Sequence, residues 1–208
     1  MVILKKVFEM GKRVYISADY SEFDGDRSVV DLLQKWGKDS LHSVDFIDMA
    51  QVISGSVSEN KDCRPCDLKA EFNRQIDASS LVIFIVGDKT AMRCAGNNCH
   101  RNNNVLCLCT PYKQNNSGSK MCKVITTKES KDFIGEINSY SYLEHEFKQS
   151  VIRKKKIIIF YNSTRNEINW LPKYMKEYEN FAVPFWIDSG NDAKSGNYQY
   201  LKEKLMDV

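Results

Sequence analysis

The chain has 208 residues, of which 42% are hydrophobic and 27% are charged, a composition that suits one soluble domain with an ordinary core. Its 30 Lys and Arg residues nearly balance 27 Asp and Glu residues, and the net charge of +3 argues against a nucleic-acid-binding protein, which usually has a strong basic excess. No stretch approaches the roughly 20 apolar residues that span a bilayer, and the beginning of the chain has no signal-peptide pattern. We therefore expect a cytoplasmic protein that binds neither membranes nor nucleic acid, with its cysteines as thiols.

Five short apolar runs, separated by longer segments, predict β-strands. They cover residues 14–17, 44–48, 81–87, 156–161 and 183–187. The third and fourth runs are continuously apolar, as in strands that are buried on both faces of a parallel sheet. Pro184 cannot donate a ladder hydrogen bond, so the fifth run is expected at an edge of the sheet.

Between these runs, apolar residues recur at the three- and four-residue spacing of helices. The recurring sets are Val29, Leu33 and Trp36; Leu68, Phe72 and Ile76; Leu143, Phe147 and Val151; Tyr174 and Tyr178; and Tyr198, Leu201 and Leu205. Asp67 comes directly before the second set and is expected to cap its helix. The basic run at residues 153–156 is interpreted as a solvated helix end, where cations suit the negative end of the helix dipole.

The alternation of strands and helices predicts an α/β protein with right-handed crossovers. We expect a flavodoxin-like, doubly wound five-stranded parallel sheet of order 2-1-3-4-5, forming a single domain over residues 1–208. A long Cys-rich insertion at residues 88–140 breaks the alternation after the third strand and has no sustained period. It leaves the sheet from the carboxyl edge, where ligands bind in this architecture. A lid over a site and a loose insertion are the two interpretations of such a loop.

The seven cysteines raise the question of a metal site. Those in the insertion are Cys94, Cys99, Cys107, Cys109 and Cys122, and two more form the motif Cys63-Arg-Pro-Cys66. With His100 they offer ligands for a structural zinc, but their spacing lacks the paired C-x2-C knuckles that such sites usually show. Reduced and packed thiols are the default interpretation, so we assign no metal ligand.

Polar residues follow the predicted strands, and the carboxyl ends of parallel strands meet at one edge of a sheet. The set is Ser17, Asp19, Tyr20, Asp48, Asp88, Lys89, Thr90, Arg93, Tyr161 and Asn162. Each alone is typical of a turn, but together they predict a ligand site. The chain has no phosphate-binding loop, no dinucleotide fingerprint after the first strand and no Gly-x-Ser-x-Gly elbow. These absences argue against a nucleotide triphosphatase, a Rossmann dehydrogenase and a serine hydrolase.

Glu146 is the most informative single residue. It lies on a predicted helix whose Leu143 and Phe147 face the core. On this helix Glu146 occupies the adjoining row of residues, at the border of the buried stripe. Such a carboxylate is either paired structurally with a neighbouring base or available for site chemistry, and the pattern alone favours the structural pair. Glu144, by contrast, is expected to form a surface pair with Lys148 at i,i+4.

Three segments, residues 12–20, 67–90 and 142–147, are similar in this order to the bacterial TIR-like proteins of the Thoeris anti-phage type. The resemblance is sharpest in Tyr142-Leu-Glu-His-Glu146-Phe, where the family carries an aromatic residue, a variable pair, an aromatic residue or His, the catalytic Glu and an apolar residue. Tyr142 stands where the family usually has Trp. The stretch 94–122 is far longer than in short TIR domains, so no contacts of the family can be transferred to it.

The resemblance implies an enzyme that cleaves NAD at the nicotinamide–ribose bond and releases a cyclic or modified ADP-ribose, which a separate effector protein senses. Nicotinamide leaves as a neutral base, so Glu146 is expected to stabilise the ribosyl cation and not to transfer a proton. NAD is then the substrate and no cofactor is expected. The expected NAD contacts are Ser17, Asp19, Tyr20, Asp48, Thr90 and Tyr142.

Two other functional hypotheses are compatible with the same sequence. A non-enzymatic TIR-like adaptor would act by assembly of domains, and a homo-oligomer is compatible with either function. A flavodoxin-like nucleotide-sugar or deoxyribosyl transferase would act on nucleosides instead of NAD.

Overall fold

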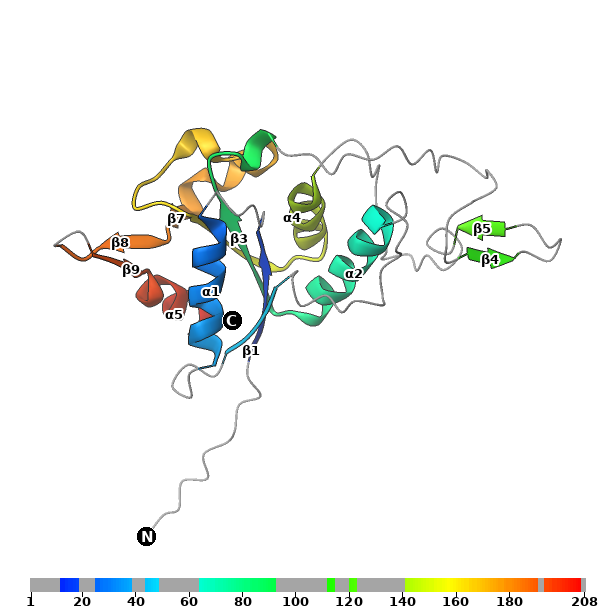
Figure 1. Cartoon of the computed structure of the whole chain (residues 1–208), viewed down its shortest axis with the longest axis horizontal. Coiled ribbons are helices and arrows are strands. Elements are labelled where there is room, and N and C mark those ends of the chain that lie inside the picture. Colours follow the sequence, from blue (N-terminus) through cyan, green and yellow to red (C-terminus); the bar gives the residue numbers. More distant parts are fainter. Residues whose placement is uncertain are drawn as a thin grey trace, which may run out of the picture.

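The computed structural model describes residues 12–18, 25–38, 44–48, 64–92, 112–114, 120–122, 141–190 and 193–206. Its main sheet consists of β1 (Lys12–Ser17), β2 (Val44–Asp48), β3 (Leu81–Val86), β6 (Lys156–Tyr161) and β7 (Ala182–Pro184). The strands lie in the order β2-β1-β3-β6-β7, and all neighbours are parallel. The parallel α/β sheet expected from the apolar runs is therefore confirmed (Figure 1).

The fifth predicted run is divided between two sheets. Its first part is β7 at the sheet edge, which is the position expected from Pro184. Its second part is β8 (Trp186–Asp188), which pairs antiparallel with β9 (Lys194–Gly196). The prediction of one continuous strand over 183–187 was wrong. The parallel ladder ends at Pro184, and the main-chain N–H of Trp186 donates instead to the carbonyl of Ser163 at 3.1 Å.

Helices cover both faces of the sheet (Figure 1). One face carries α1 (Asp26–Gly37) and α5 (Tyr198–Met206), and the other carries α2 (Arg64–Ala78) and α4 (Tyr142–Ile152). Among the described residues, 3₁₀ segments form η2 (Thr90–Met92), η3 (Ile168–Trp170) and η4 (Lys173–Phe181). The segment around Tyr174 and Tyr178, expected as a short helix, is therefore 3₁₀ in conformation.

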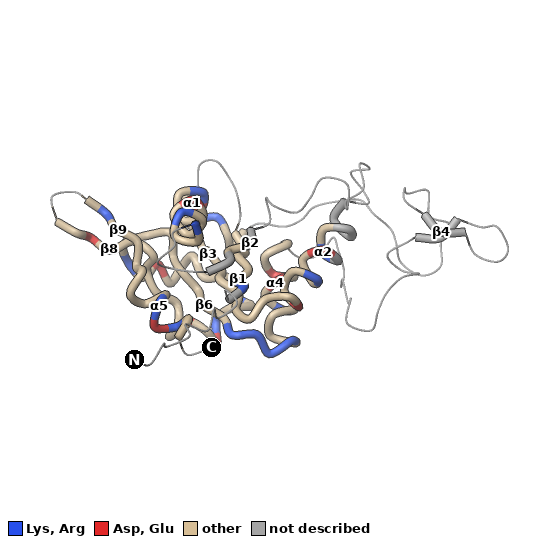
Figure 2. Tube along the Cα trace, turned by 90° about the horizontal axis from the view of Figure 1, so that it is seen from below, with Lys and Arg blue, Asp and Glu red and all other residues tan. Residues whose placement is uncertain are grey.

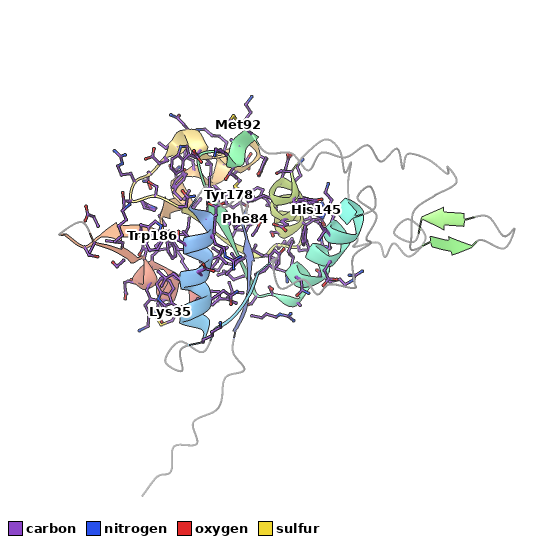
Figure 3. All side chains as sticks on the ribbon, viewed as in Figure 1. Lys35, Phe84, Met92, His145, Tyr178 and Trp186 are labelled. Carbon is purple, nitrogen blue, oxygen red and sulfur yellow. The ribbon has the colours of Figure 1, made fainter. Side chains whose placement is uncertain are left out.

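The core has two parts, one on each face of the sheet. On the α1 side, Val29 and Leu33 pack with Phe160 and Phe185. The ring of Phe185 lies 5.7 Å from that of Trp36 and 5.3 Å from that of Phe160, between centroids. Figure 3 shows Trp186 beside α1. On the α2 side, Phe72 and Ile76 pack with Phe84 and Phe147. The helical sets containing Val29, Phe72 and Leu201 face the core as predicted.

Three details of the helices differ from the expectation. Asp67 lies inside α2, because that helix begins at Arg64, so it is not an N-cap. Val151 is 42% exposed and does not belong to the core. The basic run, the longest blue stretch of the described trace in Figure 2, is not merely solvated. Lys156 Nζ donates to the carbonyl of Lys204 at 2.9 Å and so joins the start of β6 to α5.

The described part of the insertion contains η2 and a two-stranded antiparallel pair, β4 (Tyr112–Gln114) and β5 (Lys120–Cys122). Its other residues, and with them the lid hypothesis, lie outside the described residues. The same holds for Cys94, Cys99, Cys107, Cys109 and His100. Within the described ranges, no group of three or more His, Cys, Asp or Glu side chains could hold a metal ion. In these same ranges no helix has the length and apolar character of a membrane span.

Candidate functional site at the carboxyl end of strand β1

Two hydroxyl side chains on β1 point to the same face of the sheet. Tyr15 and Ser17 are two residues apart, and side chains alternate between the faces of a strand, so both face the layer of α2 and α4. Both are fully buried. Ser17 is the last residue of β1, whereas Tyr15 pairs in mid-sheet with Ile47 of β2 and Val82 of β3.

The Glu146 carboxylate of α4 lies over these two hydroxyls. Tyr15 donates its phenolic hydrogen to Glu146 Oε1 at 2.8 Å, and Ser17 Oγ donates to Glu146 Oε2. Glu146 is 0% exposed, which is deeper than the border position that its helical row predicted. Hydrogen bonds to an ionised acceptor are stronger than neutral ones, and a buried carboxylate requires such donors. The three side chains therefore form one fixed unit that joins β1 to α4.

The unit lies where this type of sheet usually binds ligands. The chain leaves β1 toward β2 on one side, while β3 lies on the other side of β1. The edge formed by the carboxyl ends of β1 and β3 is thus the topological switch point of the sheet. Ser17, at the carboxyl end of β1, is the member of the unit nearest to that edge.

Local hydrogen bonds fix α4 and its glutamate. Ser141 is the N-cap, and its side chain accepts a hydrogen bond from the main-chain N–H of Glu144 at 3.0 Å. Ser150, which is fully buried, donates from Oγ to the main-chain carbonyl of Glu146 at 2.7 Å. Glu144 pairs with Lys148 at 2.7 Å on the outer surface, as predicted.

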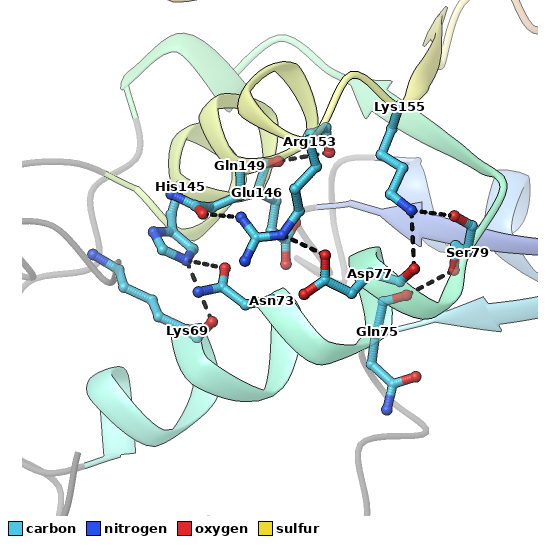
Figure 4. A network of polar contacts seen from close by, with 11 residues as sticks. Lys69, Asn73, Gln75, Asp77, Ser79, His145, Glu146, Gln149, Arg153 and Lys155 are labelled. Carbon is cyan, nitrogen blue, oxygen red and sulfur yellow. Dashed lines mark hydrogen bonds and ion pairs between the residues drawn. The ribbon is translucent and has the colours of Figure 1, made fainter. Parts of the chain in front are cut away.

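A polar seam joins α4 to α2, and it begins at His145 (Figure 4). The Nε2 atom of His145 lies 2.9 Å from Asn73 Oδ1 and 3.3 Å from the carbonyl of Lys69. Both contacts are with acceptors, so Nε2 carries the hydrogen of the neutral ring. Burial, followed by the charge of Lys69, lowers the pKa of His145 to about 3. His145 is therefore a neutral structural donor at physiological pH.

The seam continues to the end of α4 (Figure 4). Arg153 Nε is 2.8 Å from Asp77 Oδ1, and its guanidinium also donates to Gln149. Lys155 Nζ donates to the carbonyls of Asp77 and Ser79 at 2.9 and 2.8 Å. These contacts hold the C-terminal ends of α2 and α4 together, which fixes the position of the helix that carries Glu146.

A second polar group lies at the carboxyl ends of β3 and β6. Asn162, just after β6, donates from Nδ2 to Oδ1 of the buried Asp26 in the first turn of α1, at 2.5 Å. Gly87 lies beside them: a Cβ at this position would be 2.6 Å from Asn162 Nδ2 and 3.1 Å from Asp26 Oδ1, so a larger residue would require this pair to shift. The main-chain N–H of Gly87 donates to Thr90 Oγ1 at 2.8 Å. This group closes the end of β3 against α1.

The structure brings together only some of the residues expected to contact a ligand. Ser17 contacts Glu146 directly. Thr90 is buried and satisfies the turn after β3, as a capping residue does. Tyr142 is half-buried and packs edge-on against Phe72, with ring centroids 5.8 Å apart. Asp19, Tyr20, Arg93 and the side chain of Asp48 lie outside the described residues, whereas Asp88 and Lys89 are exposed.

Three partners in these groups were not predicted from the sequence. Tyr15 was placed in a strand but not beside Glu146, although its spacing of two from Ser17 puts both on one face. Asp26 and His145 carried no recognisable signal, because each acquires its role from residues more than 70 positions away.

Tyr161, at the end of β6, is buried, and burial followed by the charges of Glu179 and Glu167 raises its pKa.

The fold defines the chain as an α/β protein with a doubly wound parallel sheet. No protein-family model matches it, and no curated protein does. Among solved structures it is similar to one titled "Crystal Structure of a prokaryotic SEFIR domain". The two share 15% sequence identity over 95% of each chain, with a TM-score of 0.44.

Proposed function

We propose that the chain is a TIR-like enzyme that cleaves NAD, with Glu146 as its catalytic carboxylate. The observation that carries the proposal is the buried carboxylate of Glu146, held by Tyr15 and Ser17 beside the switch point of the sheet. The local sequence around Glu146, which resembles the catalytic helix of TIR domains, supports the same assignment.

The reaction needs one negative charge near the ribosyl carbon. The bond between C1′ and the pyridinium nitrogen breaks, and its electron pair neutralises that nitrogen, so nicotinamide leaves without protonation. The ribosyl carbon develops oxocarbenium character, as in glycoside hydrolysis. A carboxylate fixed beforehand in a low-dielectric site stabilises this cation more than a mobile one in water. Water, or a nucleophile of the substrate itself, then attacks C1′ and loses a proton.

The identity of the attacking group decides the product. Attack by water gives ADP-ribose, and attack by an adenine nitrogen or another internal nucleophile gives a cyclic or modified ADP-ribose. We propose that this product is a signal in anti-phage defence and that a separate effector protein senses it, as the resemblance to Thoeris-type proteins implies.

The test compares two glutamates that lie two positions apart on α4. Glu146→Gln keeps the size of the side chain and an acceptor for Tyr15, but removes the charge, so kcat/KM for nicotinamide release should fall by about 100-fold or more. Glu144→Gln is the matched control: it removes only the partly exposed pair with Lys148, worth about 0.3–0.5 kcal/mol, and should leave turnover unchanged. Chromatography with mass spectrometry of NAD incubations measures both nicotinamide and the second product.

One observation favours a second function, that of a non-enzymatic adaptor. Glu146 is 0% exposed and both of its oxygens accept hydrogen bonds from β1. The same unit is therefore also compatible with a purely structural role, in which it joins α4 to the sheet. An adaptor should leave NAD intact, both as purified chain and in phage-infected cells that express it. Equal NAD consumption by wild type and Glu146→Gln would exclude Glu146 as the catalytic group.

A further inference from the structure

The two hydroxyls on Glu146 are not equivalent, and the difference bears on how the site opens. We propose that Ser17 is a displaceable cap on Glu146, whereas Tyr15 is its permanent anchor. A ribose hydroxyl of the substrate replaces the Ser17 hydroxyl at Oε2, while Tyr15 continues to hold Oε1. The identity of the incoming group rests on the proposed function. The inequality of the two donors does not.

The position of the donors along β1 is the first argument. Tyr15 lies in mid-sheet, with β2 on one side and β3 on the other, and its ring belongs to the core under α2 and α4. Ser17 is the last residue of the strand. A molecule that approaches from the carboxyl edge therefore meets Oε2 and its Ser17 donor before it meets Oε1.

The freedom of the two side chains is the second argument. The Ser17 hydroxyl lies one bond beyond Cβ, so a single rotation about χ1 between staggered wells takes it away from Glu146. The Tyr15 hydroxyl can leave only if the aromatic ring moves out of a close-packed core, which is energetically unfavourable. Displacement of Ser17 is thus the change that frees a carboxylate oxygen with the least rearrangement.

The hydrogen-bond balance is the third argument. A buried carboxylate that loses a donor must gain another, because an unsatisfied charged acceptor is strongly destabilising. A ribose hydroxyl supplies the same O–H donor as serine, so the exchange keeps the number of hydrogen bonds to the carboxylate constant. Apolar ligands do not offer this exchange, and the cap therefore selects for a polyhydroxylated ligand at this oxygen.

Chemical labelling of Glu146 tests the cap without any substrate. The full-length chain is treated with a water-soluble carbodiimide and glycine ethyl ester, and modification of Glu146 is followed by peptide mass spectrometry. Ser17→Ala should raise the labelling rate by about threefold to tenfold, the range of one ordinary hydrogen bond. Tyr15→Phe should raise it clearly less. Equal rates in Ser17→Ala and Tyr15→Phe would overturn the proposal.

Ser150→Ala is the matched control for this experiment. Ser150 is buried like Ser17 and also hydrogen-bonds to Glu146, but at the main-chain carbonyl, so its removal leaves the carboxylate capped. Its labelling rate should equal that of wild type. A rate as high as that of Ser17→Ala would show that any loss of packing near Glu146 exposes it, which contradicts a specific cap.

Kinetics with NAD then separate this inference from the proposed function. Ser17→Ala should lower KM by about threefold to tenfold, because the substrate no longer competes with the serine for Oε2. Tyr15→Phe should instead lower kcat, because the carboxylate loses its fixed orientation. A higher KM in Ser17→Ala would show a substrate-binding serine and overturn the cap, although NAD cleavage would stand. Absence of NAD turnover in every variant, with selective labelling of Ser17→Ala, would overturn the proposed function and leave the cap.

Discussion

The two faces of the sheet are packed in different ways. The layer of α1 and α5 is joined to the sheet mainly by apolar side chains, among them Val29, Val30, Leu33, Leu201 and Leu205. The layer of α2 and α4 also buries polar side chains, namely Lys69, Asn73, His145, Glu146, Gln149 and Ser150. Burial of apolar side chains stabilises the folded chain without requiring a particular orientation of those side chains. A buried polar group, by contrast, must be hydrogen-bonded and so has a fixed geometry. The first face serves mainly for stability, and the second also provides a precisely oriented carboxylate.

The largest expected effect on stability is on the α1 side. Leu33→Ala removes a fully buried side chain and should lower the free energy of unfolding by about 2–5 kcal/mol, as measured by urea denaturation. Because α1 does not carry the Glu146 unit, kcat for nicotinamide release per folded molecule should stay at the wild-type value. Leu143→Ala in α4 is the counterpart: it removes an almost equally buried leucine beside Glu146 and should lower both stability and kcat. An equal loss of kcat in Leu33→Ala would end the distinction between the faces.

The second prediction concerns pH and the seam between α2 and α4. The pKa of His145 is lowered to about 3 in the folded chain, from an ordinary value of 6.5. Between these values the unfolded chain binds a proton that the folded chain does not, so stability falls as pH falls through this window. The slope from this residue is about 1.4 kcal/mol per pH unit. Above pH 6.5 the ring is neutral in both states and its contribution is constant.

His145→Gln isolates this contribution. The glutamine amide N–H₂ can donate to Asn73 and to the carbonyl of Lys69, as the ring does, but it does not titrate. Urea denaturation at a series of pH values should give a shallower acid slope for His145→Gln than for wild type. Identical slopes would mean that the ring is protonated in the folded state, and the seam would then have to accommodate a cation beside Lys69 and Arg153.

The sequence predicts the sheet better than it predicts the site, for a physical reason. The runs at 81–87 and 156–161 are apolar at nearly every position, and this pattern arises only where both faces are covered. The core of the α1 layer follows equally well from the spacing of Val29, Leu33 and Trp36. Such signals are local, because burial of an apolar side chain depends on the face of the helix or strand that it occupies and not on a particular partner.

The helix α4 shows why the same reasoning fails at the site. Its spacing placed Val151 in the core and Glu146 at the border, but Val151 is exposed and Glu146 is fully buried. The buried face of α4 is turned toward polar partners on β1 and α2, and hydrogen bonding with distant residues decides which side chains it buries. Glu146 could be selected from a family resemblance, but Tyr15 as its anchor required the fold.

The smallest predicted effect distinguishes two buried tyrosines on the same face of the sheet. The hydroxyl of Tyr15 donates to Glu146, whereas that of Tyr161 has no hydrogen-bond partner among the residues that the structure describes. Tyr161→Phe removes a buried polar group that is not satisfied there and should raise the free energy of unfolding by about 1 kcal/mol. Tyr15→Phe should lower it, because it removes a hydrogen bond to a charged acceptor. Urea denaturation of both variants side by side gives the two signs. If Tyr161→Phe is destabilised as much as Tyr15→Phe, then Tyr161 also donates to a fixed partner, and the directed polar contacts of this face extend from β1 to β6.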